Sequence, residues 1–406
     1  MKTEQGNKKI EYSELSVRLT KEISKEEKKK QGIYFTPFTT IQTNLELIDP
    51  FIKNIKTVLE PSCGTCGFIL ALSKFKHLNM TGIEYNKTIY DSVKHIANDK
   101  ISIINEDYLK YTSLKKYDLI IGNPPYFVMK KKDVVESFHK YFDGRPNIFI
   151  LFIAKSLDLL NDNGLLSFVL PQTFLNCLYY DKVRQHINDN FDIINIIKCY
   201  DEYIETKQET IIMIIQKKKK KNSMYTLDIN NYVVFGIKED IKQLKLLYKC
   251  ATNLSDLGFT VNVGTVVWNQ CKSLLTNDET KTRLIYSSDI ADKKLTKKKY
   301  VNKDKKNFIE KKGETIPILV INRGYGVGGY SFEYCLIEGE FEYLIENHLI
   351  CIKYTKQVNN NELIELYKKI IKSLGDKRTE KFINLYFGNN AINTTELNYM
   401  LPIYDF

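Results

Sequence analysis

The feature that most constrains the fold is an alternation of short apolar runs with helix-like segments in the first half of the chain. Four apolar runs follow one another at intervals of about twenty residues, namely Thr57–Leu59, Met80–Ile83, Ile101–Ile104 and Asp118–Ile121. Segments with apolar residues at helical spacing, Gly67–Phe75 and Ile89–Ala97, lie between the first three runs. This alternation predicts βαβ units, and therefore an α/β fold built on a parallel sheet.

The same alternation continues as far as Gln216. The expected elements are a helix, a strand, a helix and two closing strands that can form a hairpin, in the order Ile148–Leu160, Leu165–Leu170, Asp181–Asn190, Ile193–Cys199 and Thr210–Gln216. A run of five lysines, Lys217–Lys221, is typical of a solvated linker and marks a domain boundary. We therefore expect a charged leader with no core of its own at residues 1–30, an α/β domain at 31–221 and a second domain at 222–406.

The second domain lacks the regular alternation. Ile237–Cys250 and Leu363–Leu374 have the apolar spacing of amphipathic helices. Strands are expected at Gly258–Gln270, Thr282–Tyr286, Ile316–Asn322 and His348–Tyr354. A lysine-dense stretch, Ala291–Lys312, is expected to be a loop. The mixture predicts an α+β domain.

Positive charge is concentrated in this second domain. The chain has 60 Lys and Arg against 49 Asp and Glu, a net charge of +11. Residues 1–215 contribute 29 basic and 27 acidic side chains, a net +2, whereas residues 216–406 contribute 31 and 22, a net +9. Such a field favours an anionic partner, with nucleic acid as the leading candidate. A generally lysine-rich, solvated surface is the alternative explanation.

No segment is suited to cross a membrane. The longest uncharged apolar run, Ile148–Ala154, is far shorter than the roughly 20 residues of a membrane span. The N-terminus has no apolar stretch of the kind found in secretory signals. The eight scattered cysteines are typical of reduced thiols. We therefore expect an intracellular protein.

The segment that carries chemistry is Asn123-Pro124-Pro125-Tyr126, which follows the fourth apolar run. Two consecutive prolines fix the backbone and remove two N–H donors, so the corner is rigid and exposes carbonyl groups. The Asn123 side-chain oxygen and the Pro124 carbonyl can each accept one hydrogen of an exocyclic amino group, and Tyr126 can stack on its ring. The corner suits a planar substrate with an amino group, whereas a turn formed by chance is the alternative.

Polar residues also end the first three strands, next to this corner. The first turn, Glu60–Gly67, brings glycine to a strand–helix junction, where a ligand can approach the backbone closely. Glu84 ends the next strand and can accept both hydroxyls of a ribose, while Asp107 follows the third strand and can accept from an adenine amino group. Because the first turn is acidic and lacks GxGxxG, a cationic nucleoside cofactor fits it better than a pyrophosphate.

Residues 31–217 resemble the S-adenosylmethionine-dependent amino-methyltransferases, specifically the gamma-type adenine-N6 DNA methyltransferases of bacterial and algal-virus restriction–modification systems. Tyr34-Phe-Thr36-Pro37 resembles their N-terminal cofactor motif, Glu60–Phe68 their first motif and Asn123–Tyr126 their catalytic tetrapeptide. Gly164–Pro171 is similar to the strand and turn of a later motif. The resemblance implies a Rossmann-like methyltransferase sheet followed by a mixed α+β DNA-recognition domain.

The resemblance also implies which residues form the site. The implied catalytic residues are Asn123, Pro124 and Tyr126, with Tyr203 as a second aromatic wall for the target base and Tyr200 as its runner-up. The implied cofactor-binding residues are Tyr34, Thr36, Glu60, Ser62, Cys63, Gly64, Gly67, Glu84, Asp107, Tyr108, Asn123 and Pro125. Cys66 departs from the pattern, because the family has a glycine there, and the backbone contact at this position stays open.

We therefore expect methyl transfer from S-adenosylmethionine to N6 of an adenine flipped out of double-stranded DNA. N4-cytosine DNA methylation is the nearest alternative, although the asparagine of the tetrapeptide and the N-terminal order of motifs favour adenine. RNA or protein-glutamine methylation is less compatible with a basic domain of about 185 residues. A non-catalytic DNA-binding module is disfavoured by the intact Asn123, Glu84 and Asp107.

Expected partners are double-stranded DNA and a separate cognate restriction endonuclease, since residues 1–30 are too few to hold a nuclease. The expected protein is a monomer in the cytoplasm, or in the host cell if it is viral. Candidate base and phosphate contacts are Trp268–Lys272, Arg323–Gly326 and the lysines between Lys293 and Lys306. No metal site is expected, because Cys63 and Cys66 form an isolated pair and the five histidines do not cluster.

Overall fold

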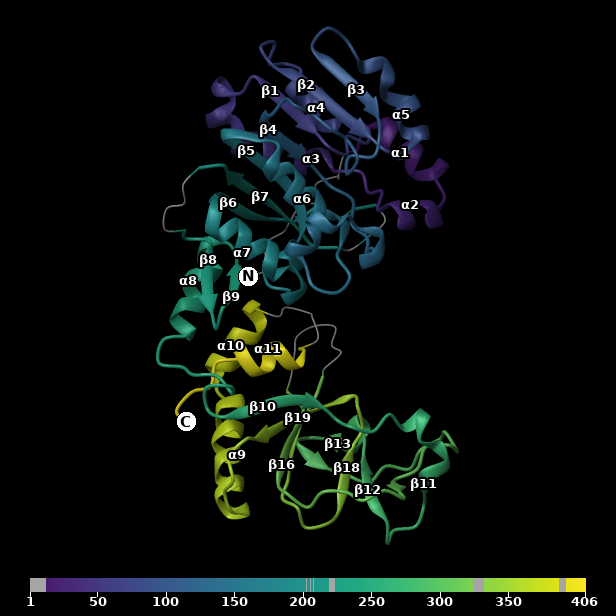
Figure 1. Ribbon diagram of the computed structural model, residues 1–406, viewed down its shortest axis with the longest axis vertical. Helices are drawn as coiled ribbons and strands as arrows, with labels where there is room; N and C mark the ends of the chain where they lie inside the picture. The colour runs from purple at the N-terminus through teal and green to yellow at the C-terminus, as the bar shows by residue number, and fades with distance from the viewer. Residues whose placement is uncertain are drawn as a thin grey trace, which may run out of the picture. The chain divides into compact units, whose positions relative to one another are not determined.

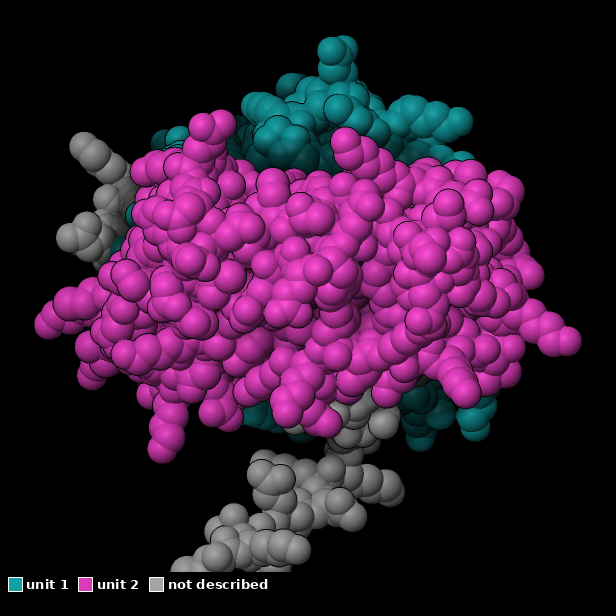
Figure 2. Space-filling view, turned by 90° about the horizontal axis from the view of Figure 1, so that it is seen from below, with its two compact units in different colours: residues 1–241 teal, residues 242–406 magenta. Residues whose placement is uncertain are grey.

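The computed structural model divides into two compact units, residues 1–241 and 242–406, which are coloured separately in Figure 2. It describes residues 12–201, 203–204, 206, 208–218, 223–323, 332–386 and 392–406. Parts of two predicted features, the lysine run at 219–221 and the segment 324–326, lie outside the described residues.

The first unit extends beyond the boundary predicted at Lys221. The hairpin of β8 (Thr226–Ile229) and β9 (Tyr232–Phe235) belongs to it, because Val233 and Phe235 join the same core cluster as the central sheet. The buried Arg184 of α7 (Asp181–Asn190) strengthens this attachment by donating to the Val233 carbonyl at 2.6 Å. The linker-like lysine run therefore precedes the last hairpin of the unit.

A seven-stranded sheet forms the centre of the first unit (Figure 1). Its strand order is β3-β2-β1-β4-β5-β7-β6, and the strands in chain order are β1 Thr57–Glu60, β2 Asn79–Glu84, β3 Ile101–Asn105, β4 Tyr117–Gly122, β5 Leu160–Pro171, β6 Asp192–Cys199 and β7 Thr210–Gln216. Strands β1 to β5 are parallel, and β7 runs antiparallel between β5 and β6. The sheet confirms the predicted α/β fold, and it is mixed rather than all-parallel.

Both faces of this sheet are apolar because successive residues of a strand point to opposite sides. In β4, Leu119 and Ile121 pack into the cluster on one face, whereas Ile120 packs into the cluster on the other. Helices cover each face: α3 (Phe38–Ile48) and α4 (Gly67–Leu72) contribute to the first cluster, and α6 (Ile148–Asp158) and α7 to the second. The continuous apolar runs in the sequence therefore mark strands that are buried on both faces.

The N-terminal leader is helical and shares a small apolar cluster with the segment that follows it, so it has no separate core. Helix α1 (Glu14–Glu22) and helix α2 (Lys25–Gln31) precede the sheet. Leu19 and Ile23 are buried against Phe35 and against Ile89 of α5 (Lys87–Val93). This packing makes the leader a wall of the first unit, which sequence spacing did not indicate because few of its residues are apolar.

The second unit is a mixed α+β structure, as predicted. Its main four-stranded sheet has the order β10-β19-β16-β17, with bounds Phe259–Val263, Leu349–Tyr354, Ile318–Asn322 and Tyr334–Ile337. A smaller sheet contains β11 Leu275–Thr276, β15 Phe308–Ile309, β12 Thr282–Ile285 and β18 Tyr343–Ile345. The helices are α8 Lys238–Leu247, which spans the unit boundary, α9 Asn360–Leu374, α10 Lys377–Tyr386 and α11 Thr394–Tyr399.

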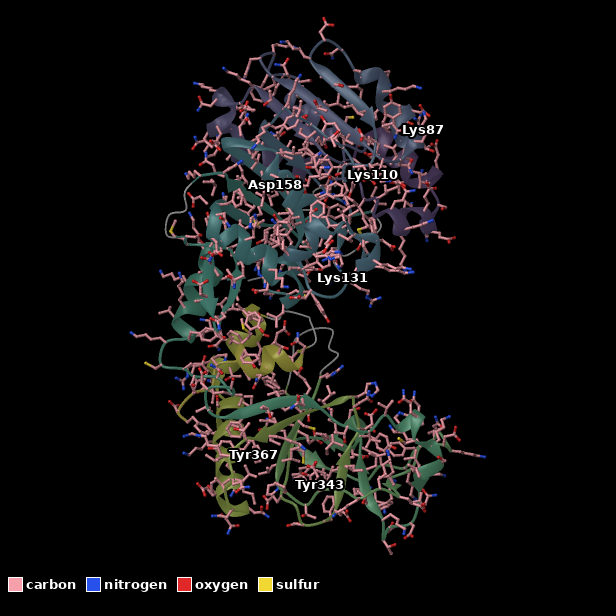
Figure 3. All side chains as sticks on the ribbon, in the orientation of Figure 1. Lys87, Lys110, Lys131, Asp158, Tyr343 and Tyr367 are labelled. Atoms are coloured by element: carbon pink, nitrogen blue, oxygen red, sulfur yellow. The ribbon has the colours of Figure 1, made fainter. Side chains whose placement is uncertain are left out.

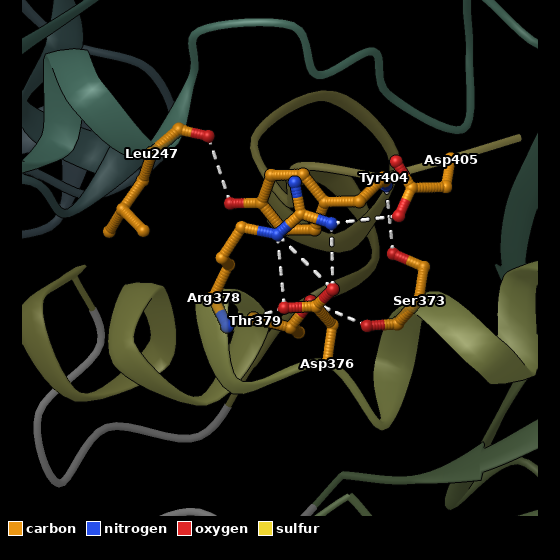
Figure 4. Close-up of polar contacts among 7 residues, drawn as sticks. All are labelled: Leu247, Ser373, Asp376, Arg378, Thr379, Tyr404 and Asp405. Atoms are coloured by element: carbon orange, nitrogen blue, oxygen red, sulfur yellow. Dashed lines mark hydrogen bonds and ion pairs between the residues drawn. The ribbon is translucent and has the colours of Figure 1, made fainter.

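The C-terminal segment is tied to the helices of this unit (Figure 4). The Arg378 guanidinium pairs with Asp376 at 2.7 Å and Asp405 at 2.9 Å, and it lies 4.0 Å from the centre of the Tyr404 ring. The Tyr404 hydroxyl donates to the Leu247 carbonyl at 2.9 Å. The last residues of the sequence therefore close the packing of the second unit. Within the described parts of the chain, no helix combines the length and apolarity that crossing a bilayer requires.

Candidate active site

A cavity of about 340 Å³ opens in the first unit at the carboxyl ends of β1, β2 and β4. Open α/β sheets bind ligands at this edge, and the volume lies in the range of small-molecule sites. Its lining includes the charged or polar residues Ser62, Glu84, Glu106, Asp107 and Asn123. Residues 30–35, where the leader joins the α/β domain, form one wall.

Glu84 is the most strongly constrained acid in the cavity. Its two carboxylate oxygens each accept one backbone N–H, from Gly64 at 2.8 Å and from Asn86 at 2.7 Å. Each oxygen keeps a lone pair for a hydroxyl of a ligand. Burial nevertheless raises the pKa of Glu84 to about 7, because desolvation outweighs the backbone hydrogen bonds that favour the charged form.

The other wall combines an acidic residue with apolar side chains. Asp107 accepts the Leu109 N–H at 3.0 Å and remains partly exposed toward the cavity. Five apolar side chains complete the lining on this side: Leu109, Phe127, Met129, Ile148 and Phe152. A planar ring with polar edges can lie between such apolar surfaces while its amino group reaches the carboxylate.

The Asn123 amide lies where β4 ends and is held on both sides. Its Nδ2 donates to the Tyr34 carbonyl at 3.3 Å, and its Oδ1 accepts the Tyr126 hydroxyl at 2.7 Å. Ser62, on the turn after β1, donates to the Asn123 carbonyl at 3.1 Å. The segment around Tyr34, the first turn and the proline corner therefore all fix the position of this one residue.

The Tyr126 hydroxyl also lies 2.8 Å from the Val169 carbonyl of β5. The Tyr126 ring packs edge-on against the Phe149 ring of α6, with 5.9 Å between the ring centres. Burial raises the pKa of Tyr126 well above its usual value, and the neighbouring Tyr203 and Cys199 raise it further. Tyr126 is therefore a neutral hydroxyl between two carbonyl-type oxygens.

Comparison with known proteins relates the first half of the chain to a described family. Residues 10–204 match the family described as Eco57I restriction-modification methylase.

Residues 10–204 are a restriction–modification methylase domain of the Eco57I family.

Two relatives match almost the whole chain. The modification methylase CviBIII of Paramecium bursaria Chlorella virus NC1A is 26% identical over 393 residues, which cover 94% of this chain and 96% of that protein. The type II methyltransferase M.CvrRI of Paramecium bursaria Chlorella virus XZ-6E is 28% identical over 400 residues, with coverages of 94% and 96%. The chain is thus a DNA methyltransferase of restriction–modification type, and its cofactor is S-adenosylmethionine.

Among solved structures, the chain is similar to one in the cryoEM structure of a DrdV–DNA complex. The TM-score is 0.51 at 11% identity, and the alignment covers 96% of this chain and 57% of that one. At this identity the likeness shows a shared fold alone.

The residues around the cavity of the methylase domain fit S-adenosylmethionine. Glu84 offers acceptors for ribose hydroxyls, and Asp107 offers one for an adenine amino group. Three acidic side chains, Glu84, Glu106 and Asp107, face one basic residue, Lys30, in the lining. A cationic sulfonium compound is compatible with this balance, whereas a pyrophosphate would be repelled.

The cofactor-binding residues predicted for the methylase domain divide into two groups. Seven of them line the cavity: Tyr34, Ser62, Gly64, Glu84, Asp107, Asn123 and Pro125. Tyr108 also borders it, although its ring is buried and its hydroxyl bonds Ser156 at 2.9 Å. The roles of these residues remain predictions.

Thr36, Glu60, Cys63 and Gly67 are not part of the cavity lining in the described structure. Glu60 is 2% exposed, and its carboxylate accepts the Ile69 N–H of α4 at 3.3 Å. Burial raises the pKa of Glu60 well above its usual value, so it does not offer a ready negative charge to a ligand. Gly67 is packed against Ile41, since a Cβ there would lie 2.6 Å from its Cδ1.

Cys66 has a backbone conformation that glycine adopts more easily than other residues, which explains why the family pattern has a glycine at this position. Its φ is 60°, in the left-handed region, and its side chain is completely buried. Most residues avoid this region because Cβ crowds the backbone. The departure from the family pattern therefore affects the start of α4, behind the cavity, rather than a surface that a ligand touches.

The two predicted aromatic walls lie in different environments. Tyr203 is 7% exposed and close enough to Tyr126 to influence its pKa, whereas the alternative, Tyr200, is 90% exposed. Pro124 is buried, and neither Pro124 nor Tyr126 lines the cavity itself. Stacking by Tyr203 on a target base stays a prediction.

The apolar part of the cavity was not predicted from the sequence. Phe35, Phe127 and Phe152 line it, but nothing in their spacing distinguished them from core residues. The sequence contained one indication that Phe35 lies near the cofactor, namely its position inside the Tyr34–Pro37 motif. Among the described residues, no group of three histidine, cysteine, aspartate or glutamate side chains could hold a metal ion.

The candidate DNA contacts in the second unit are partly engaged. Trp268 lies in a 3₁₀ turn, Trp268–Gln270, rather than on the predicted strand, because β10 already ends at Val263. Lys305 lies over the rings of Tyr286 and Tyr300, at 4.0 and 4.3 Å from their centres, and burial lowers its pKa. Lys298, Lys299 and Lys303 are exposed. Lys305 therefore anchors the loop, whereas its neighbours face solvent.

Proposed function

We propose that this chain is a site-specific methyltransferase that acts on the N6 amino group of an adenine flipped out of double-stranded DNA. The observation that carries the proposal is the Asn123 amide at the cavity edge. Its Oδ1 is held by Tyr126, and its Nδ2 is held by the Tyr34 carbonyl. The amide oxygen can therefore accept a hydrogen from a group that enters beside the cofactor cavity.

The surroundings of Asn123 favour a ligand that brings hydrogen-bond donors. The Tyr126 hydroxyl lies between two acceptors, Asn123 Oδ1 and the Val169 carbonyl. It has only one proton to donate, so one of these two oxygens can accept a further hydrogen bond. An exocyclic amino group has two N–H donors and would complete the set. Thymine has no amino group, and its O4 is an acceptor, so thymine would not. This supports a target base that carries an exocyclic amino group, as adenine and cytosine do.

The protein's part in the reaction is positioning and electrostatics. When bound, S-adenosylmethionine supplies an electrophilic methyl group. We propose that Glu84 and Asp107 hold the ribose and adenine of this cofactor, with Tyr108 beside the adenine. Asn123 Oδ1 and the Pro124 carbonyl would each accept one amino hydrogen, which increases electron density on the nitrogen. The proton released from the amine then passes to solvent.

The amino group of a paired adenine is not accessible inside a duplex, so the base must leave the helix first. Tyr126 and Tyr203 are the proposed aromatic partners of the flipped base. The exposed lysines at 298, 299 and 303 of the second unit are proposed to contact phosphates. The proposed partners also include a separate cognate endonuclease, and the proposed state is a monomer.

Adenine is preferred over cytosine because Asn123 opens the tetrapeptide and the Tyr34–Pro37 motif precedes it. The test is to incubate the purified chain with tritiated S-adenosylmethionine and DNA from cells that lack DNA methylation, and to digest the DNA to nucleosides. Label in N6-methyldeoxyadenosine would support the proposal. Label in N4-methyldeoxycytidine would replace it with the alternative, and label in neither nucleoside would contradict both.

A further inference from the structure

A loop in the first unit continues directly from the proline corner and carries three lysines. We name residues 128–135 the lysine loop, which Figure 3 marks by its label on Lys131. Lys130, Lys131 and Lys132 are all exposed. Two exposed valines flank them, Val128 at 60% and Val135 at 69% exposure. Nucleic-acid contacts were expected only in the second domain, so these lysines had no assigned function.

The lysine loop has a fixed backbone. The Met129 N–H donates to the Pro146 carbonyl at 2.8 Å, and the Ile148 N–H donates to the Phe127 carbonyl at 2.9 Å. Val134 is buried in a small cluster with Phe142 and Leu151, which anchors the far end. The lysines therefore project from an ordered segment, and little additional backbone entropy is lost when they bind a partner.

Within the described parts of the chain, these lysines make no ion pair or side-chain hydrogen bond. Lys130, Lys131 and Lys132 form no ion pair with any described carboxylate, although Asp133 and Glu136 are exposed in and beside the same loop. Other basic residues nearby are occupied: Lys182 pairs with Asp143 at 2.7 Å, and Lys155 donates to the Tyr111 carbonyl at 2.6 Å. The loop thus presents uncompensated positive charge to solvent.

The chain length limits how far these charges can lie from the site. Lys130 is seven residues after Asn123, so their Cα atoms are separated by at most about 25 Å. Phosphates of one DNA strand follow each other at about 3.4 Å along the helix axis. The lysine loop therefore begins no further from Asn123 than about seven such phosphate steps.

We propose that the lysine loop binds the phosphates that flank the target nucleotide, an inference that rests on the proposed function. Lysine is a mobile point charge and suits a backbone whose sequence varies. A clamp on the flanking phosphates holds the strand in register while the base rotates out of the stack. Phosphate contacts of this kind carry no sequence information, so recognition of the bases depends on other residues.

The test replaces the three lysines in the full-length chain by Lys130→Gln, Lys131→Gln and Lys132→Gln. Binding to a short fluorescent duplex is followed by anisotropy at increasing salt. Each lost phosphate contact reduces the slope of log affinity against log salt by about 0.9. We expect the magnitude of this slope to fall by about 2 to 3 in the triple variant and by about 1 in Lys131→Gln alone.

The matched control changes the same charge at the opposite edge of the sheet. Lys74, Lys76 and Lys100 are exposed and lie before the amino ends of β2 and β3, whereas Asn123 follows the carboxyl end of β4. Replacing these three by glutamine should leave the slope unchanged. If the lysine-loop variant and the control variant have equal slopes, the proposal is wrong.

A second measurement separates this inference from the proposed function. The salt dependence of kcat/KM for methyl transfer is measured on DNA from cells that lack the modification, which needs no knowledge of the recognition sequence. The triple variant should show the reduced slope while its KM for S-adenosylmethionine stays at the wild-type value. A wild-type chain that methylates DNA, beside a triple variant with an unchanged slope, overturns the lysine-loop proposal alone. A wild-type chain that methylates no DNA overturns the proposed function.

Discussion

At the scale of single residues, the proposed chemistry depends on where one amide oxygen is held. Asn123 takes part in hydrogen bonds with Tyr34, Tyr126 and Ser62, which come from three different segments. An amide has one acceptor end and one donor end, and only the acceptor end can bind an amino group. The contacts around Asn123 fix which end faces which neighbour.

Replacing Asn123 by alanine removes this acceptor and leaves the cavity walls in place. We expect kcat to fall by at least about 100-fold, the scale on which single preorganised polar groups act in catalysis. The affinity for S-adenosylmethionine, measured by calorimetry, should stay within a few-fold of wild type. A variant with substantial transfer activity would remove Asn123 from the mechanism. Asn123→Asp serves as the control, because it keeps an acceptor oxygen and should retain more activity than Asn123→Ala.

Glu84 makes stability depend on pH in an unusual direction for a carboxylic acid. Its pKa in the folded protein is raised to about 7 by burial, whereas an unfolded glutamate has a pKa of about 4.3. Between these values the folded state binds more protons than the unfolded state, so the free energy of unfolding falls as pH rises. This contribution is complete below about pH 4.3 and is lost through about pH 7.

The corresponding measurement compares wild type with Glu84→Gln in urea unfolding from pH 5 to pH 8. The wild type should lose stability relative to the variant as pH rises, by up to about 3 kcal/mol, because only the wild type has a carboxyl group to ionise there. Parallel curves for the two proteins would show that Glu84 titrates normally.

Cofactor affinity should change in the opposite direction. The charged carboxylate accepts two ribose hydroxyls, whereas the protonated form has reduced acceptor capacity. Because the pKa of Glu84 is raised to about 7, affinity for S-adenosylhomocysteine should rise between pH 6 and pH 8. Calorimetry on wild type should show this rise. Glu84→Gln should bind more weakly at pH 8 and show little change with pH.

At the scale of elements, the leader and the proline corner meet at one glycine. Gly32 ends α2 with φ at +66°, and a Cβ there would lie 2.7 Å from the Tyr126 backbone nitrogen. Real Cβ atoms essentially never approach a backbone atom this closely, so a side chain would push the corner away. The close approach couples the wall of the cofactor cavity to the segment that carries Asn123 and Tyr126.

Gly32→Ala should therefore reduce both stability and kcat. Gly144→Ala is a matched control, since Gly144 has the same φ of +66° but no atom within 4 Å of the position that an alanine methyl group would take. Both variants carry the cost of a left-handed alanine, about 1 kcal/mol. Only Gly32→Ala adds the clash, so we expect it to be less stable than Gly144→Ala and to lose at least about 10-fold in kcat. Equal stabilities and equal rates for the two variants would show that the proline corner can move away from the new methyl group without loss of stability or activity.

At the scale of the whole molecule, the first unit closes with a hairpin that sequence patterning assigned to the second. Tyr225, Val233 and Phe235 are nearly completely buried in the core cluster around α6 and α7. Arg184 and Asp181 of α7 also bond the backbone of Val233. The hairpin β8–β9 is therefore part of the core of the methylase-containing unit.

Two truncated chains test this assignment. Residues 1–241 should fold cooperatively and bind S-adenosylmethionine. Residues 1–221 lack three buried aromatic or branched side chains and also lack the Val233 carbonyl that accepts from the buried Arg184. We expect the shorter chain to be less stable by more than about 3 kcal/mol, the cost of losing one large core side chain. Equal melting temperatures would show that the hairpin is dispensable.

Patterns in the sequence were enough to predict a parallel sheet, the positions of its first strands along the chain and the polar residues at their ends. Continuous apolar runs, such as those around Ile83 and Ile120, identify strands buried on both faces. Polar residues placed at or directly after the ends of such runs, such as Glu84 and Asn123, have to meet at one edge because parallel strands end together. Local patterns are sufficient here, since the site is built from consecutive strand ends.

What lies behind or across from those residues became known only from the way the elements pack together. Glu60 and Gly64 belong to one short turn, yet Glu60 is buried at α4 and Gly64 lines the cavity. The contacts of Gly32 with the proline corner, of Arg184 with β9 and of Leu19 with Ile89 join segments that are distant in sequence. Such contacts depend on packing between elements, and spacing along a chain carries no information about which distant side chains will share a core.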